Sequence, residues 1–422
     1  MQSVPHINAR GGRKTVERTT TPLRVCTYWP TRQGPFFWEQ ADLGEIGDEL
    51  AHFADLGGDL VRLLLPWETF QPSAERINTQ ALDTLGRLLD LAHEEHVRVL
   101  PVLFTGVLFG QRFLPRWALQ LDPTARPFAR TLSEGREQPH ALVKNIYEAR
   151  PLLDAQRRLI TEVVGYFGEH PAIYAWDLSG NGLPAYVPPR TPEALVEWAA
   201  LLRETAREAE EGRHPVWLTL PDAAASLPFL PWAWDLTREG LHVLVETYPH
   251  IYPFAADAPA DFVRFTAHLW RATADAAPGV LVGVATAPNQ EREHLLVLPA
   301  EDDATPPTTI RLPHESVQAH IWQTLFETLG QSDAPLLGNA TFADVPPVLW
   351  ETPPFDKAIR PRFMGLLADN GREKEAARLW RETRLAAEPT PLRPLDVDLE
   401  ALRAEPHATL ARWFRQFREG EI

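Results

Sequence analysis

The feature that most constrains the fold is a regular alternation of short apolar runs with longer amphipathic segments. The runs are rich in β-branched and aromatic residues, as in buried strands, and the segments between them have the apolar spacing of helices. Eight runs occur, at 24–29, 59–65, 97–104, 172–178, 216–220, 241–248, 280–287 and 335–341. Helical segments follow most of them, at 42–57, 79–96, 152–168, 193–211, 260–276, 316–329 and within 356–384. This alternation predicts a parallel sheet covered by helices.

Eight strand–helix units in roughly 360 residues fit a closed (β/α)8 TIM barrel with long loops after some strands. An open, doubly wound sheet is the alternative, but no glycine-rich phosphate loop follows the first run. The segment 222–239 is ambiguous, and 105–150 and 288–312 are predicted to be a long loop and an irregular insertion. We expect three parts: a disordered segment at 1–22, the barrel at 23–385, and a helical extension at 386–422 that packs on the barrel.

The chain is acidic, with a formal net charge of −16. Proteins that bind nucleic acid present a basic face, and no such face is visible, so we expect neither nucleic acid nor anionic membranes as partners. No run of about 18 apolar residues occurs, so no membrane span is predicted. The N-terminus lacks the apolar core of a signal peptide, which predicts a cytoplasmic location, or export if a signal segment has been removed.

Metal and cofactor chemistry find little support in the sequence. Cys26 is the only cysteine, which excludes intrachain disulfides and thiolate clusters. His93 and His96 lie three apart in a helical segment and lack the HExxH spacing of zinc proteases. We therefore expect no metal site and no cofactor.

The carboxyl ends of the strands form the site in a (β/α)8 barrel, so we examined the residues that follow each predicted strand. They offer aromatic rings together with amide, guanidinium, imidazole and phenol groups. Aromatic rings can stack on the apolar faces of sugars, and fixed polar groups can bind hydroxyls. The candidate ligand-binding residues are Trp29, Arg62, Trp67, Asn181, His250, Tyr252 and Trp350.

Several stretches, in order along the chain, resemble glycoside hydrolases of clan A, nearest to family 5 of the cellulase and mannanase type. The resemblance extends from about residue 24 to about residue 384. The stretches that carry it best are GGDLVRLLLPWETFQP for the second strand, HPAIYAWDLSGN for the fourth, TYPHIYPF for the sixth and GVLVGVATAPN for the seventh. Arg62, Asn181, His250 and Tyr252 match family positions.

The resemblance also implies where the catalytic groups should be. Family members hydrolyse glycosidic bonds with retention, using one glutamate after the fourth-strand asparagine as acid/base and another at the end of the seventh strand as nucleophile. A retaining mechanism needs both carboxyl groups, ~5–5.5 Å apart. This chain has Gly182 at the acid/base position and Val284 at the nucleophile position. We therefore expect a barrel that binds an oligo- or polysaccharide without standard hydrolysis.

Two alternatives remain open, so whether the chain is an enzyme is not decided by the sequence. One is an active glycoside hydrolase with relocated carboxylates such as Glu246 and Asp344. A charge inside a strand must be paired or functional, and for Glu246 we expect a buried arginine partner, Arg62. We interpret Asp177, on the fourth strand, as structural. The other alternative is a non-catalytic scaffold that binds a protein partner.

Overall fold

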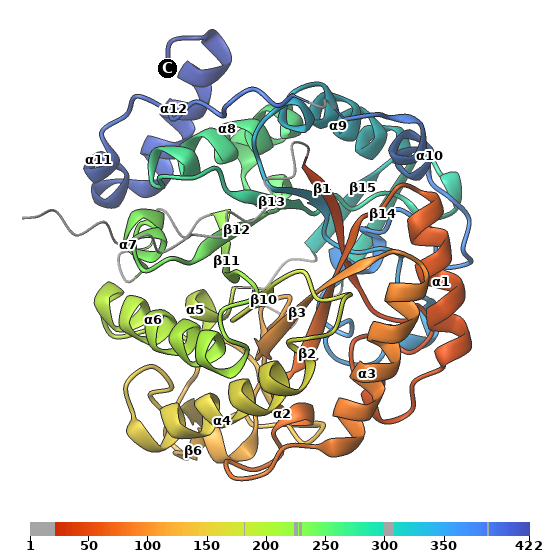
Figure 1. Ribbon diagram of the computed structural model, residues 1–422. Helices are drawn as coiled ribbons and strands as arrows, with labels where there is room; N and C mark the ends of the chain where they lie inside the picture. Colours follow the sequence, from red (N-terminus) through yellow and green to blue (C-terminus); the bar gives the residue numbers. More distant parts are fainter. Residues whose placement is uncertain (1–21, 181, 223–226, 228–229, 299–307, 386–387) are drawn as a thin grey trace, which may run out of the picture.

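The computed structural model describes residues 22–180, 182–222, 227, 230–298, 308–385 and 388–422. Its centre is a closed barrel of parallel strands in the order β1-β16-β13-β12-β11-β10-β3-β2 (Figure 1). These strands are β1 (Leu23–Tyr28), β2 (Leu60–Pro66), β3 (Arg98–Thr105), β10 (Trp176–Asp177), β11 (Val216–Pro221), β12 (His242–Thr247), β13 (Gly279–Val282) and β16 (Leu336–Asn339). The prediction of a (β/α)8 barrel is confirmed.

Helices surround the barrel and cover the outer face of its strands (Figure 1). They are α1 (Leu43–Asp55), α3 (Thr79–Glu94), α4 (Arg150–Phe167), α6 (Pro192–Ala209), α7 (Ala233–Arg238), α8 (Pro259–Ala272), α9 (Glu315–Glu327) and α10 (Glu375–Glu382). The first shows why such helices form: the Asp42 side chain caps its N-terminus, and Ile46, Leu50 and Phe53 bury one face. In the segment 222–239, which the sequence left ambiguous, residues 233–238 form helix α7.

The interior of the barrel is filled by inward-pointing apolar side chains, in the manner expected of this fold. One separate cluster consists of Leu23, Val25, Leu60, Leu100, Ala175, Trp217, Leu244, Leu281 and Leu336. Gly338 on β16 allows the neighbouring strand to approach closely, because a Cβ at this position would lie 2.0 Å from the carbonyl oxygen of Val25. The barrel is thus a packed core, and its chemistry lies at the strand ends.

Two insertions contain more structure than the sequence predicts. The loop predicted at 105–150 includes a four-stranded sheet of β4 (Val107–Leu108), β5 (Gln111–Phe113), β7 (Thr131–Ser133) and β8 (Arg136–Glu137), and a pair formed by β6 (Leu119–Leu121) and β9 (Ala141–Val143). The insertion predicted as irregular at 288–312 includes two antiparallel strands, β14 (Glu293–Leu298) and β15 (Thr308–Pro313). The strands at 105–150 have only two or three residues, which is too short for a recognisable alternation of apolar and polar residues. The strands β14 and β15 were not predicted because prolines near β15 argue against a strand.

The C-terminal helix α12 (Pro406–Glu419) packs against the barrel's outer helix α8, and α11 (Leu399–Ala404) packs against α12. The ring of Phe414 lies 5.5 Å from that of Phe262 and 5.7 Å from that of Phe265. Apart from Pro22, the segment 1–22 predicted as disordered lies outside the described residues. Over the ranges that the structure does describe, we find no helix long and apolar enough to cross a bilayer.

Candidate functional site

A buried charge cluster occupies the mouth of the barrel, centred on Arg62 of β2. The Arg62 side chain is fully buried, with Nε 3.3 Å from Asp177 Oδ2 and Nη1 3.0 Å from Glu246 Oε1. Thr219 of β11 donates its hydroxyl to Asp177 and accepts from Arg62 Nη2 at 3.3 Å. Burial raises the pKa of Asp177, and the Arg62 charge opposes that rise. The predicted ion pair between Arg62 and Glu246 is confirmed.

The two positions where the resemblance places catalytic glutamates follow β10 and β13. Gly182 has φ +76°, and a Cβ there would lie 3.7 Å from Tyr186 and 3.8 Å from Pro221, so the position has space but favours glycine. Val284 is 9% exposed, and its carbonyl oxygen accepts from Gln318 Nε2 at 3.3 Å. Asn181 lies outside the described residues. Neither Gly182 nor Val284 has a side chain that can transfer a proton.

A third carboxylate at the mouth, that of Asp222, was not among the residues predicted from the sequence. Its Oδ1 accepts from the Tyr252 hydroxyl at 2.7 Å, and its Oδ2 accepts from the Thr247 hydroxyl at 2.8 Å. Burial and the Asp222 charge raise the pKa of Tyr252. The available signal for Asp222 was its position two residues after the strand predicted at 216–220. Tyr252, predicted to bind ligand, is 5% exposed and engaged in holding Asp222 to the β12 loop.

The three predicted aromatic platforms are less open than their place at strand ends suggested. Trp67 is fully buried, and its indole N–H donates to Gln71 Oε1 at 2.9 Å. Trp29 is 5% exposed. Trp350 is half-buried, and the guanidinium carbon of Arg362 lies 5.0 Å from its ring centroid. In this conformation Trp67 and Trp29 pack in the protein interior, and only Trp350 has substantial exposed surface.

The carboxylate of Asp344, proposed as a relocated catalytic group, forms a buried ion pair. Its Oδ1 lies 2.7 Å from Lys374 Nζ and accepts from the Gly365 backbone at 2.8 Å. Lys374 also donates to the Thr286 hydroxyl at 3.0 Å, so it joins the ends of β13 and β16. Burial raises the pKa of Asp344 to about 6, opposed by the Lys374 charge.

Two cavities border the carboxyl ends of the strands. One, of about 420 Å³, is lined by His250 and Val284, with Arg311 and Arg360 at its rim. His250 keeps solvent-exposed surface, while partial desolvation of its imidazole and the Arg360 charge lower its pKa to about 4. The other, of about 470 Å³, includes Glu68, whose pKa burial raises to about 7. Both volumes lie within the ~300–1,000 Å³ typical of small-molecule sites.

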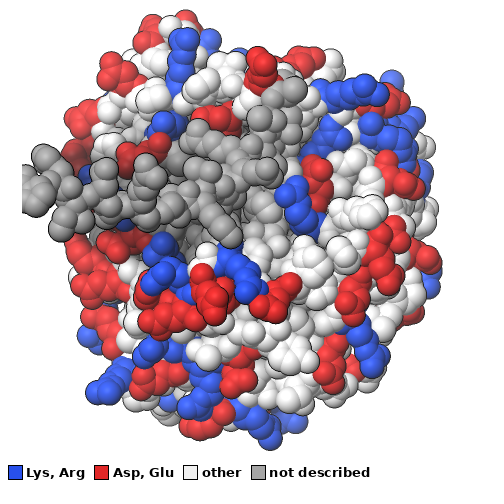
Figure 2. Space-filling model, viewed as in Figure 1, with Lys and Arg blue, Asp and Glu red and all other residues white. Residues whose placement is uncertain are grey.

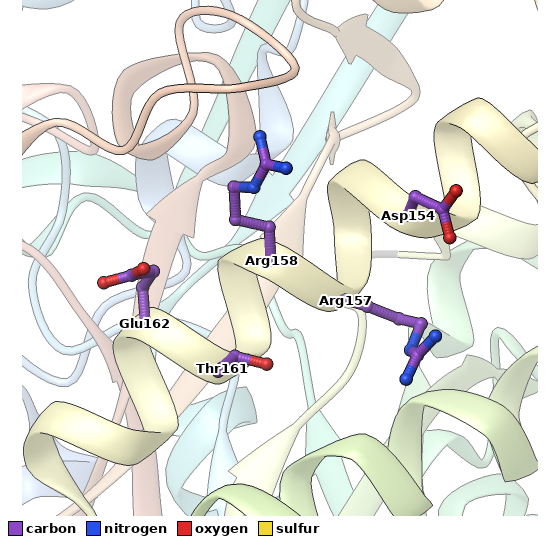
Figure 3. Close-up of a pocket in the computed structure, with 5 residues that line it drawn as sticks. All are labelled: Asp154, Arg157, Arg158, Thr161 and Glu162. Atoms are coloured by element: carbon purple, nitrogen blue, oxygen red, sulfur yellow. The ribbon is translucent and has the colours of Figure 1, made fainter.

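A shallow surface pocket, of about 350 Å³, lies away from the strand ends. All of its lining residues belong to helix α4, and Figure 3 shows them along that helix: Asp154, Arg157, Arg158, Thr161 and Glu162.

The face of the molecule in Figure 2 carries acidic and basic side chains interspersed, without a continuous basic region. In the described ranges no cluster of three or more His, Cys, Asp or Glu is arranged to hold a metal ion.

Several solved structures have a fold similar to that of this chain. No protein-family model matches the chain, and no curated protein matches it significantly. A GH5_18 variant from Streptomyces cattleya, solved in complex with Manb1-4GlcNAc, matches with a TM-score of 0.68 and 19% identity, over 95% of this chain and 92% of that one. A GH5_18 protein from Bifidobacterium longum subsp. infantis matches with a TM-score of 0.67 and 19% identity, over 95% and 90%.

A third match is to a protein longer than this chain. The exo-beta-1,4-mannosidase Op5Man5 from Opitutaceae bacterium strain TAV5 has a TM-score of 0.65 and 19% identity, over 85% of this chain and 58% of its own. Sequence identities this low establish the architecture and not the activity. The chain therefore has the barrel fold of GH5_18 and other glycoside hydrolase structures.

Proposed function

We propose that this chain is a glycoside-hydrolase-like barrel that binds an oligo- or polysaccharide and does not perform standard retaining hydrolysis. The observation that carries the proposal is the pair of residues that follow β10 and β13. Gly182 and Val284 stand where the resemblance places the acid/base and the nucleophile. General acid/base catalysis contributes roughly 10²–10⁴ in rate, and loss of the nucleophile also removes the covalent route.

Carbohydrate binding is supported by the fold and by the surroundings of the strand ends. Neighbouring structures hold Manb1-4GlcNAc and GlcNAc. In this chain, His250 is exposed at a cavity of suitable volume, and Trp350 keeps part of its surface accessible to solvent. These groups could bind sugar hydroxyls and an apolar sugar face without any chemistry on the glycosidic bond.

One observation favours the second candidate, hydrolysis by relocated carboxylates. Asp344 has a pKa of about 6, which suits a general acid near neutral pH. Against it, Asp344 is ion-paired with Lys374, and Glu246 with Arg62. Each carboxylate therefore already neutralises a buried cation, and both would need new surroundings to act on a substrate.

The proposal is tested by measuring turnover and binding on the same preparation. We expect no release of aryl groups from β-mannosides or β-glucosides, and no hydrolysis of glucan, mannan or xylan. Calorimetric titration with Manβ1-4GlcNAc or longer oligosaccharides should give saturable binding. His250→Ala should weaken that binding about 3–10-fold, the equivalent of one neutral hydrogen bond.

The matched control is Arg150→Gln, on the outer helix α4, where the side chain is 91% exposed. It should leave binding unchanged. Turnover by the wild type that disappears in a folded Asp344→Asn variant would establish the second candidate instead. No heat with any oligosaccharide would contradict carbohydrate binding and leave the scaffold alternative.

A further inference from the structure

The cavity beside Val284 has an unusual charge for an acidic protein. Its inner wall includes Gly283, Val284 and Ala285, at the end of β13. The polar groups that line it are an imidazole and two guanidiniums, from His250, Arg311 and Arg360. No acidic side chain of the described residues is among those that line it, although the whole chain carries 57 Asp and Glu against 41 Lys and Arg.

Arg360 is the strongest sign that this cavity is built for an anion. It lies half-buried in the short helix η9 (Arg360–Phe363), and no carboxylate of the described residues pairs with it. Its Nη1 donates to the backbone carbonyl oxygen of Arg311 at 3.3 Å. Desolvation lowers the pKa of Arg360, as expected for a cation removed from water without a counter-charge.

Arg311 differs from Arg360 in having a partner. It lies on β15 and forms an ion pair with Glu293 on β14, and its side chain is 74% exposed. Arg311 therefore adds positive charge at the rim of the cavity, but its guanidinium already has a carboxylate partner. Of the two guanidiniums, that of Arg360 has no carboxylate partner among the described residues and can donate hydrogen bonds to a bound anion.

We propose that the cavity beside Val284 binds the carboxylate of an acidic sugar, with Arg360 as the main contact and His250 as a hydrogen-bonding neighbour. The inference rests on the proposed carbohydrate function and names the class of sugar. A guanidinium binds a carboxylate through two parallel hydrogen bonds, and a neutral imidazole can donate one more. Valine at position 284 suits this role, because a glutamate there would place a like charge in the same cavity.

The test compares two sugars that differ only at C6, methyl β-glucuronide and methyl β-glucoside, by calorimetry at low salt. The glucuronide should bind about 10-fold or more tightly than the glucoside, the ratio expected for a hydrogen bond to a charged group. Arg360→Gln should remove most of that difference, because the variant lacks the guanidinium that contacts the carboxylate. Raising the salt concentration should weaken glucuronide binding selectively.

Arg150→Gln serves again as the control, since it removes one exposed positive charge from helix α4, which does not line the cavity, and should preserve the preference. Equal binding of the two sugars, or a preference that survives in Arg360→Gln, would overturn the inference. If neutral oligosaccharides still bind in that case, the proposed function stands without it. Inorganic phosphate that binds through Arg360 while glucuronide does not would overturn the sugar assignment in favour of a phosphate site.

Discussion

Replacing Arg62 with methionine should lower the free energy of unfolding by about 3–5 kcal/mol, measured by urea denaturation at neutral pH. The substitution removes a buried cation and leaves the carboxylates of Asp177 and Glu246 without their shared counter-ion. Methionine fills a similar volume, so the loss reports mainly the uncompensated charge and not a cavity. The variant should also show a weaker near-ultraviolet circular dichroism signal, because the aromatic side chains near the strand ends would be packed less firmly.

Two control variants separate the effect of the lost charge on stability from the effect of the changed side-chain size and from the general effect of replacing an arginine. Arg62→Lys keeps the positive charge but cannot reach both carboxylates through a planar fork, so its loss should be intermediate. Arg150→Met, at an exposed site, should change stability by no more than about 0.5 kcal/mol. A loss below about 1 kcal/mol for Arg62→Met would mean that water or a rearranged partner neutralises the carboxylates.

Arg62 also shows how far the sequence could specify the site. A glutamate inside an apolar strand must find a cation, and Arg62 was the obvious candidate because it lies on another predicted strand of the same barrel. The strands and helices of the barrel could be predicted from the sequence, since the strands are continuous apolar runs and the helices keep an apolar period of 3.6 over their whole length. Even so, the fourth strand, predicted at 172–178, contains only Trp176–Asp177 as regular strand, with a separate bridge at Ile173.

Exposure was the property that the sequence could not supply. A tryptophan after a strand has the same local pattern whether it faces a ligand or the core, and Trp67 turned out to be fully buried. The partner of Asp344 is Lys374, thirty residues away in the chain. The basic cavity joins His250 and Arg360, which no sequence spacing relates. Such contacts depend on how loops fold over the strand ends, and loop conformation has no periodic signal.

Replacing Lys374 with methionine should produce a loss of stability that depends strongly on pH. At pH 8 we expect a loss of about 2–3 kcal/mol, because Asp344 would lose the cation that stabilises its buried charged form. At pH 4 the loss should be much smaller, because Asp344 would be protonated. Urea denaturation of wild type and variant at several pH values measures this difference directly.

The sign follows from the pKa of Asp344, which is about 6 in the folded wild type, above the value of about 3.9 expected for an unfolded chain. A group whose pKa rises on folding favours the folded state at low pH, and that benefit is lost as the pH rises through the folded pKa. Removing Lys374 takes away the charge that holds this pKa down, so it should move above 6. The stability deficit relative to wild type should therefore grow between the wild-type pKa of about 6 and the new pKa, and level off beyond it.

The double variant Lys374→Met, Asp344→Asn provides the decisive comparison, because it removes both charges and keeps the side-chain volumes similar. It should recover most of the stability lost at pH 8 and show little of the pH dependence, as expected when a buried ion pair is replaced as a unit. A single variant as stable as wild type at pH 8 would mean that Asp344 is not held as a buried counter-ion. Asp344 would then be free to take up a proton at the barrel mouth, and hydrolysis by a relocated carboxylate would regain support over binding alone.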